Sequence, residues 1–165
     1  MSLMEFQFAL LRVCEWIQYN GPLVAMRGSP WFFPFIASIH LLGLATIGGA
    51  VLLVDLRLLG FGLRRQPVAQ LALEAERWLR VGLGVAMSTG ILLFMCFATK
   101  YYWLTAFWVK LASLIMVLAF TMSIRRRVTL TDEARVSPAL RRLVALVSIS
   151  LWTTVALGGR LIGFP

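Results

Sequence analysis

Three basic side chains interrupt apolar stretches of this 165-residue chain, and they are the residues best suited to chemistry. His40, the only histidine, lies in the run WFFPFIASIHLLGLATIGG, Lys110 lies in a later run, and Arg160 lies near the end of the last one. A charged group in hydrocarbon is costly, so such residues usually face a bundle interior and mark a functional site. Imidazole is a common axial ligand of haem iron, and cations attract anions. The pattern therefore predicts a site for an anionic ligand, with His40 as the metal ligand.

Other residues reach the same depth when helices are counted at about 1.5 Å per residue. Thr89 falls level with His40, while Met87 and Met116 fall about one turn deeper. Both methionines are therefore candidates for a second axial ligand to a haem. Gly43, one turn along the same face as His40, would let a flat ring approach the helix. We include all of these in the predicted cofactor-binding site.

Each basic residue also has a simpler interpretation. Lys110 and Arg160 have stems long enough to carry their charges to the lipid headgroups. A lone histidine inside a span is more often a hydrogen-bonded packing residue than a ligand. A zinc or copper site made by protein ligands alone is not expected, because the chain has one histidine, two cysteines and no CxxC. No nucleotide-binding glycine loop with a lysine is recognisable.

The elements that must position these residues are membrane helices. The chain is 60% apolar and 14% charged, and its mean hydropathy is +0.84. A span needs about 20 apolar residues, and the sequence predicts four, at about 31–55, 78–99, 103–124 and 141–162. A segment at about 3–18 has apolar residues on one helix face, which predicts a helix that lies in the membrane interface or packs on the other helices. The fold class is therefore all-α, a single four-helix membrane bundle over residues 1–165.

Orientation follows from the basic residues, since short cytoplasmic loops carry the excess of arginine and lysine. Most arginines lie around two connections, as Arg57, Arg64, Arg65, Arg77 and Arg80 and as Arg125, Arg126, Arg127, Arg135, Arg141 and Arg142. We expect a multi-pass protein of a bacterial inner (cytoplasmic) membrane with both termini periplasmic. The net charge of +9 is then explained by topology and by contact with the lipid bilayer, and nucleic acid is not an expected partner.

Helix contacts are predicted at two places. Small residues recur at four-residue steps in Gly82, Ala86 and Gly90, and in Ser150, Thr154 and Gly158, and this spacing lets helices approach closely in lipid. At the cytoplasmic edge we place Asp55 and Arg57 just past the first span. We expect them to pair with Glu74, Glu76, Arg77 and Arg80, and we expect no carboxylate inside the spans.

Nearly the whole chain resembles a family of uncharacterised small bacterial inner-membrane proteins with four spans. The segments that carry the resemblance are WFFPFIASIHLLG, DLRLLG, TGILLF, AFWVK and GGRLIGF. More distantly, the chain is similar to the membrane protoporphyrinogen oxidases and to the copper-resistance D-type proteins. The resemblance to the oxidases implies haem b and maps their histidine, arginine and lysine to His40, Arg57 and Lys110. Their second histidine has no counterpart, since the corresponding region reads VLAFTMSIRRR.

Three functions fit these observations. In the first, haem b or a similar redox ligand is held by His40, with Lys110 and Arg160 near its carboxylates. The protein then transfers electrons, with quinone or a redox protein as partner, and His40 of a second subunit in a homo-oligomer could complete the iron. In the second, the same basic residues line a transporter or channel for a small anion or proton. In the third, the chain is a non-catalytic accessory subunit. The first is the preferred hypothesis, and catalytic residues remain unknown.

Overall fold

The computed structural model describes residues 3–19, 21–62, 66–131 and 135–162, and this part of the chain is helical with no strand. Four helical stretches are long and apolar enough to cross a membrane. They are α3 (Phe32–Leu59), α4 (Val68–Cys96), the continuous stretch Thr105–Leu130 and α8 (Pro138–Ile162). The third stretch consists of α6 (Thr105–Phe120), a π-helical turn η1 (Thr121–Arg125) and α7 (Arg126–Leu130). The all-α membrane bundle predicted from the sequence is confirmed.

We call one end of the bundle the basic end; it is the end at which α3 and α7 finish and α4 and α8 begin. Helix α3 stops there because Gly60 adopts a left-handed conformation with φ of 91°, which favours glycine. Its N–H donates to the carbonyl of Arg57, and the next N–H, of Phe61, donates to Leu56. Helix α8 begins with Pro138, and the Ser137 hydroxyl accepts the N–H of Leu140 at 3.2 Å.

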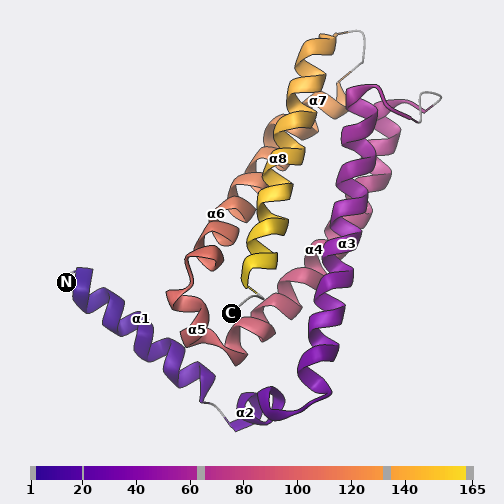
Figure 1. Cartoon of the computed structure of the whole chain (residues 1–165). Coiled ribbons are helices and arrows are strands. Elements are labelled where there is room, and N and C mark those ends of the chain that lie inside the picture. Colours follow the sequence, from indigo (N-terminus) through magenta and orange to yellow (C-terminus); the bar gives the residue numbers. More distant parts are fainter. Residues whose placement is uncertain (1–2, 20, 63–65, 132–134, 163–165) are drawn as a thin grey trace.

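Three short helices lie at the opposite end, where α3 and α6 begin and α4 and α8 end (Figure 1). We call it the aromatic end because stacked aromatic side chains join the helices there. They are α1 (Leu3–Gln18), α2 (Gly21–Gly28) and α5 (Ala98–Trp103). Helix α1 occupies the predicted range and is held to α5 by Gln18, whose side-chain oxygen accepts the Thr99 N–H at 3.0 Å and the Thr99 hydroxyl at 2.6 Å. Phe94, Tyr101 and Phe107 stack on one another and join the ends of α4, α5 and α6.

The helix boundaries differ from the sequence-based ones mainly at the basic end. Helix α3 continues to Leu59, and α4 begins at Val68 rather than near residue 78. Both extensions carry charged residues, which lower the hydropathy of these segments. Spans predicted from hydropathy therefore stop at the end of the apolar run, although the helix continues. The separate helices α2 and α5 and the turn η1 were not predicted.

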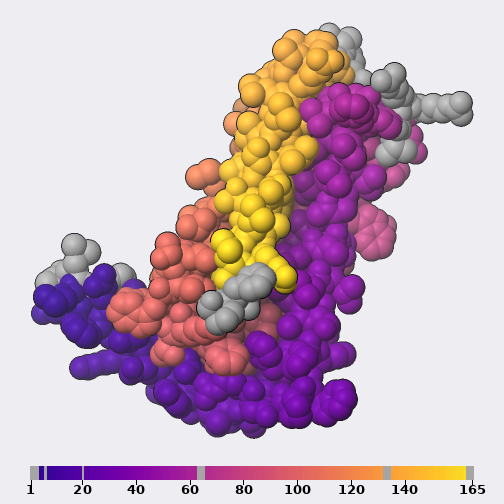
Figure 2. Space-filling view, viewed as in Figure 1, coloured from indigo at the N-terminus to yellow at the C-terminus, as the bar shows by residue number. Residues whose placement is uncertain are grey.

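The helices pack as two pairs, α3 with α4 and α6 with α8, and α8 also lies against α3 (Figure 1). In Figure 2, α8 fills the space between α6 and α3. One buried cluster, which includes Val54, Leu58 and Ala145, closes the bundle near the basic end. A second, of Ile47, Val51 and Ala86 with Trp152 packed on it, lies nearer its middle.

The closest approach of α3 and α4 is made at two glycines. A Cβ on Gly43 would lie 3.0 Å from the Ala86 nitrogen and 3.2 Å from the Gly82 oxygen. A Cβ on Gly82 would lie 2.9 Å from the Ile47 side chain and 3.0 Å from the Gly43 oxygen. The predicted close packing through Gly82 is therefore present, and a larger side chain at either position would push the helices apart.

Candidate functional site

His40 of α3 faces α4 and is held there by a hydrogen bond. Its Nδ1 lies 3.0 Å from the hydroxyl oxygen of Thr89, which is buried. The ring packs beside Gly90, where a Cβ would come within 3.1 Å of the imidazole Cε1. Two neighbouring residues of α4 thus position the ring: Thr89 supplies the hydrogen bond and Gly90 supplies the space.

The hydrogen bonds around Thr89 determine which nitrogen of His40 carries the proton. The Thr89 hydroxyl lies 2.6 Å from the Val85 carbonyl oxygen, so it donates its one proton there. In that arrangement it accepts from His40, which favours the tautomer with the proton on Nδ1. The Ala86 carbonyl, 3.4 Å from the same hydroxyl, is a further acceptor on that side of the ring. The neutral imidazole is left with a lone pair on Nε2, the form in which histidine binds metals.

Lys110 of α6 runs along two glycines of α8. A Cβ on Gly158 would lie 3.1 Å from the Lys110 Cβ, and a Cβ on Gly159 would lie 3.3 Å from its ammonium nitrogen. The stem is therefore directed across α8, and Lys110 is close enough to His40 for their charges to interact. Within the described ranges no ion pair involves Lys110. The structure thus brings together an imidazole and an ammonium from two different helix pairs.

The other predicted site residues are placed less centrally. Arg160 is exposed and follows Gly159 in the last turn of α8. Met87 and Met116 are 44% and 59% exposed, which puts their side chains on the outer surface of the bundle. Gly43 is buried against the backbone of α4, so the space that we expected it to leave for a flat ring is taken by helix packing.

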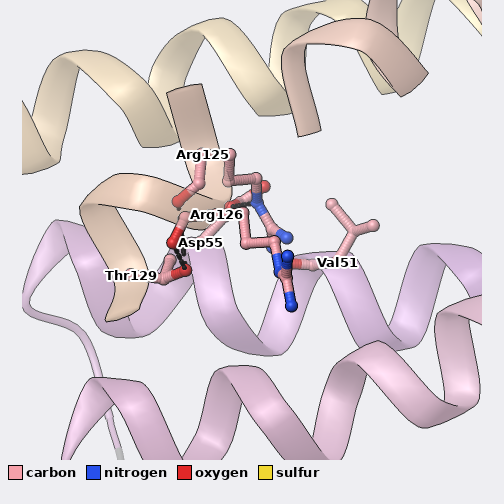
Figure 3. A network of polar contacts seen from close by, with 5 residues as sticks. All are labelled: Val51, Asp55, Arg125, Arg126 and Thr129. Atoms are coloured by element: carbon pink, nitrogen blue, oxygen red, sulfur yellow. Dashed lines mark hydrogen bonds and ion pairs between the residues drawn. The ribbon is translucent and has the colours of Figure 1, made fainter. Parts of the chain in front are cut away.

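A second polar centre, which the sequence reading missed, lies nearer the basic end (Figure 3). Asp55 is fully buried inside α3, and its Oδ1 accepts the Nε–H of Arg125 at 3.0 Å. Arg125 also donates from Nη2 to the Val51 carbonyl at 3.3 Å. The π-helical turn η1 ends at Arg125, and such turns occur often at functional sites.

This centre corrects two expectations. Asp55 does not lie past the first span, and a carboxylate is present inside a span, because α3 continues beyond it to Leu59. Arg57 points to the adjacent turn, where its Nε donates to the Gln66 carbonyl at 3.2 Å. Glu76 of α4 lies 3.7 Å from Arg126, so this contact joins α4 to α7 and not to α3.

Helical spacing could have revealed the second centre. Asp55 lies about four turns from His40 on the same face of α3, and Arg125 lies about four turns from Lys110 on the inward face of α6 and η1. The residues between them, Ile47 and Val51 on one helix and Val117 and Thr121 on the other, are buried. The sequence signal for this pair was therefore that Asp55 and Arg125, which have opposite charges, occupy matching positions on the inward faces of two helices.

Residues 21–165 match a family of unknown function, DUF6644. The chain belongs to this family. Both polar centres and all four spanning stretches lie within the matched residues, whereas α1 lies outside them. No curated protein and no solved structure gives a significant match. Membership in the family confirms the predicted resemblance to an uncharacterised family and assigns no chemistry.

No compact metal-binding cluster accompanies these centres. Within the described part of the chain, no three histidine, cysteine, aspartate or glutamate side chains are grouped to hold a metal ion. Cys14 and Cys96 are buried free thiols, and burial raises the pKa of the Cys14 thiol.

Proposed function

We propose that the protein binds a b-type haem in the half of the bundle nearer the aromatic end and transfers electrons within the membrane. The observation that carries the proposal is the hydrogen bond from His40 Nδ1–H to Thr89, because it fixes the ring and leaves the Nε2 lone pair for iron. Metal-binding histidines almost always have such a bond from their other nitrogen. Bound haem would supply one-electron chemistry at its iron.

Lys110 supports the same proposal through charge. An ammonium in a span needs an anionic partner or water, and the described residues supply it with no ion pair. A haem propionate is an anion of the required kind, and Arg160, one residue beyond Gly159, would lie near a second propionate. His40, Lys110 and Arg160 would therefore hold the ligand, with Thr89 positioning the imidazole.

The placement of the methionines narrows the expected coordination. Because the side chains of Met87 and Met116 lie on the outer surface, neither is well placed to share an iron with His40. We therefore expect His40 to be the one side chain of each chain that would bind the iron. His40 of a second subunit in a homo-oligomer would be a further ligand. A quinone or a redox protein would be the electron partner.

The experiment is a visible spectrum of the full chain purified from cells grown with ample haem. A Soret band with acid-extractable haem is expected, since no CxxCH exists for covalent attachment. Lys110→Met should abolish haem retention without unfolding the protein, whereas Lys100→Met, a change at an exposed lysine of α5, should not. If the Lys110→Met variant retains as much haem as the wild type, Lys110 does not bind the haem and its ammonium contacts lipid headgroups instead.

A second candidate function is the transport of a small anion or proton. It is favoured by the position of the two polar centres, which lie about four turns apart on the same inward faces of α3 and α6. Flux of protons or chloride into vesicles containing the protein tests this candidate. Flux that is lost in both Lys110→Met and Asp55→Asn, in a colourless protein, would favour transport over redox chemistry.

We also propose the orientation that the charges suggest. The basic end would face the cytoplasm of a bacterial cell and the aromatic end the periplasm, with both termini periplasmic. The exposed arginines of the basic end, such as Arg126 and Arg127, would then contact anionic lipid.

A further inference from the structure

Four buried polar atoms in the described part of the chain have no hydrogen-bond partner. They are Asp55 Oδ2, Thr121 Oγ1, Ser148 Oγ and Trp152 Nε1. Asp55 and Ser148 are 0% exposed and Thr121 is 8% exposed. Leaving such groups unbonded costs free energy anywhere in a protein, and a membrane supplies no water from outside to bond them.

The two hydroxyls differ from others in these helices. Thr46, Ser88 and Thr154 each donate to the carbonyl four residues earlier, at 2.8–2.9 Å, which is how a helix satisfies a hydroxyl in lipid. Thr121 and Ser148 make no such bond. Their hydroxyls are therefore free to bond something in the bundle interior.

The four residues are related by their positions along the helices. The Ser148 side chain lies beside the Asp55 carboxylate, but outside hydrogen-bond geometry. Trp152 is one turn further along α8 from Ser148, and Thr121 is one turn before Arg125. Counted along the helices, the four residues thus fall at two successive levels, one next to the Asp55–Arg125 pair and one a turn closer to the aromatic end.

The chemistry of these atoms selects the ligand. Asp55 and Arg125 neutralise each other, so a charged ligand gains little at this centre. Ionised Asp55 only accepts, Trp152 only donates, and the two hydroxyls do both. A molecule that both donates and accepts is needed to join them. Buried water does this, making about three hydrogen bonds to groups that would otherwise be unsatisfied.

We propose that Asp55, Thr121, Ser148 and Trp152 line a buried water-binding site beside Arg125. Water at the first level donates to Asp55 Oδ2 and bonds the Ser148 hydroxyl. Water at the second level accepts from Trp152 Nε1 and bonds the Thr121 hydroxyl. The site lies apart from His40 and does not depend on haem binding.

An experimental map of the full chain in lipid, at a resolution that shows other buried waters, tests the proposal directly. Ordered solvent is expected within hydrogen-bond distance of Asp55 Oδ2 and Ser148 Oγ. A dry interior, with Ser148 donating straight to Asp55 and Thr121 bonded to its own helix, would overturn it.

A stability measurement provides a second test. Thr121→Val should lower Tm by a few degrees, because it removes a group bonded to water. The matched control is Thr154→Val, whose hydroxyl is exposed and bonds its own helix, and it should change Tm less. If Thr121 is unbonded in a dry core, removing its hydroxyl leaves Tm unchanged or raises it, and that result would contradict the proposal.

Discussion

At the residue scale, the hydrogen bond between His40 and Thr89 decides what the imidazole can do. Thr89 gives its proton to Val85 and accepts from His40, which favours the tautomer with Nε2 unprotonated. An unprotonated Nε2 is the atom that would bind iron in the proposed function, and Lys110 is near enough for its charge to interact with His40.

Thr89→Val should weaken haem binding by about 10–100-fold, the usual effect of losing the hydrogen bond behind a metal-binding histidine. The measurement is the haem dissociation constant by absorbance. Ser88→Ala is the matched control, because Ser88 is exposed and its hydroxyl bonds Gly84 of its own helix. Equal affinities of the two variants would mean that Thr89 does not orient the ligand.

The sequence predicted the residues around His40 and Lys110, but it did not predict the buried pair of Asp55 and Arg125. His40 and Lys110 stand out because each interrupts an apolar run, and depth counting placed Thr89 beside His40. Asp55 and Arg125 sit at the ends of apolar runs, where hydropathy cannot distinguish a buried pair from charges in solvent. Only the matching of inward faces on two helices identifies them as partners.

At the element scale, α3 and α4 pack so closely that their backbones are in contact. Gly43 and Gly82 face each other, and neither position has room for a Cβ without movement of the opposite helix. This contact keeps His40 at the depth of Thr89 and Gly90. The small-residue spacing on α4 predicted it, although it could not show that Gly43 is the partner on α3.

Gly82→Ala should therefore lower the free energy of unfolding by about 1–3 kcal/mol, the usual cost of overpacking. Gly84→Ala is the control, since no atom lies within 4 Å of a Cβ built there. That change should stabilise the helix by about 0.5–1 kcal/mol. Unfolding in mixed micelles measures both, and a smaller loss for Gly82→Ala than for Gly84→Ala would show that the helices are not in close contact.

The Asp55–Arg125 pair fixes η1 against α3, and breaking it should be costly. Arg125→Met should lower the free energy of unfolding by about 3–5 kcal/mol, because it leaves a buried carboxylate without its partner. Asp55→Leu combined with Arg125→Met should recover most of the loss. Glu76→Gln, which breaks the more exposed pair with Arg126, should cost at most about 1 kcal/mol. A double variant no more stable than Arg125→Met would contradict this account of the pair.

At the scale of the whole molecule, the bundle has two unlike ends. Arginines such as Arg57, Arg127 and Arg141 lie near the helix ends of the basic end. Aromatic residues such as Tyr101 and Trp103 lie in α5, which with α1 and α2 covers the opposite end (Figure 1). Composition predicted this polarity and the number of spans, because bilayer thickness and charge bias act on whole segments. It could not predict the breaks at Phe97 and Leu104 or the π-helical turn, which depend on contacts between segments.

Single cysteines at Gln66 and Ser137 should react with an impermeant thiol reagent only from the cytoplasmic side, and one at Gly21 only from the periplasmic side. Gln66, Ser137 and Gly21 are all exposed. The native thiols give a low background, since Cys14 and Cys96 are buried and burial raises the pKa of Cys14. Labelling of Gln66 or Ser137 from the periplasm would reverse the proposed orientation.

The most direct test of the central claim is a haem titration of the purified full chain in detergent or nanodiscs, compared with His40→Ala. The account predicts a Soret band that grows to saturation in the wild type and is absent in His40→Ala, while both proteins keep the same helical content. A wild-type protein that takes up no haem, or a His40→Ala variant that binds it equally well, would contradict the assignment of His40 as the iron ligand.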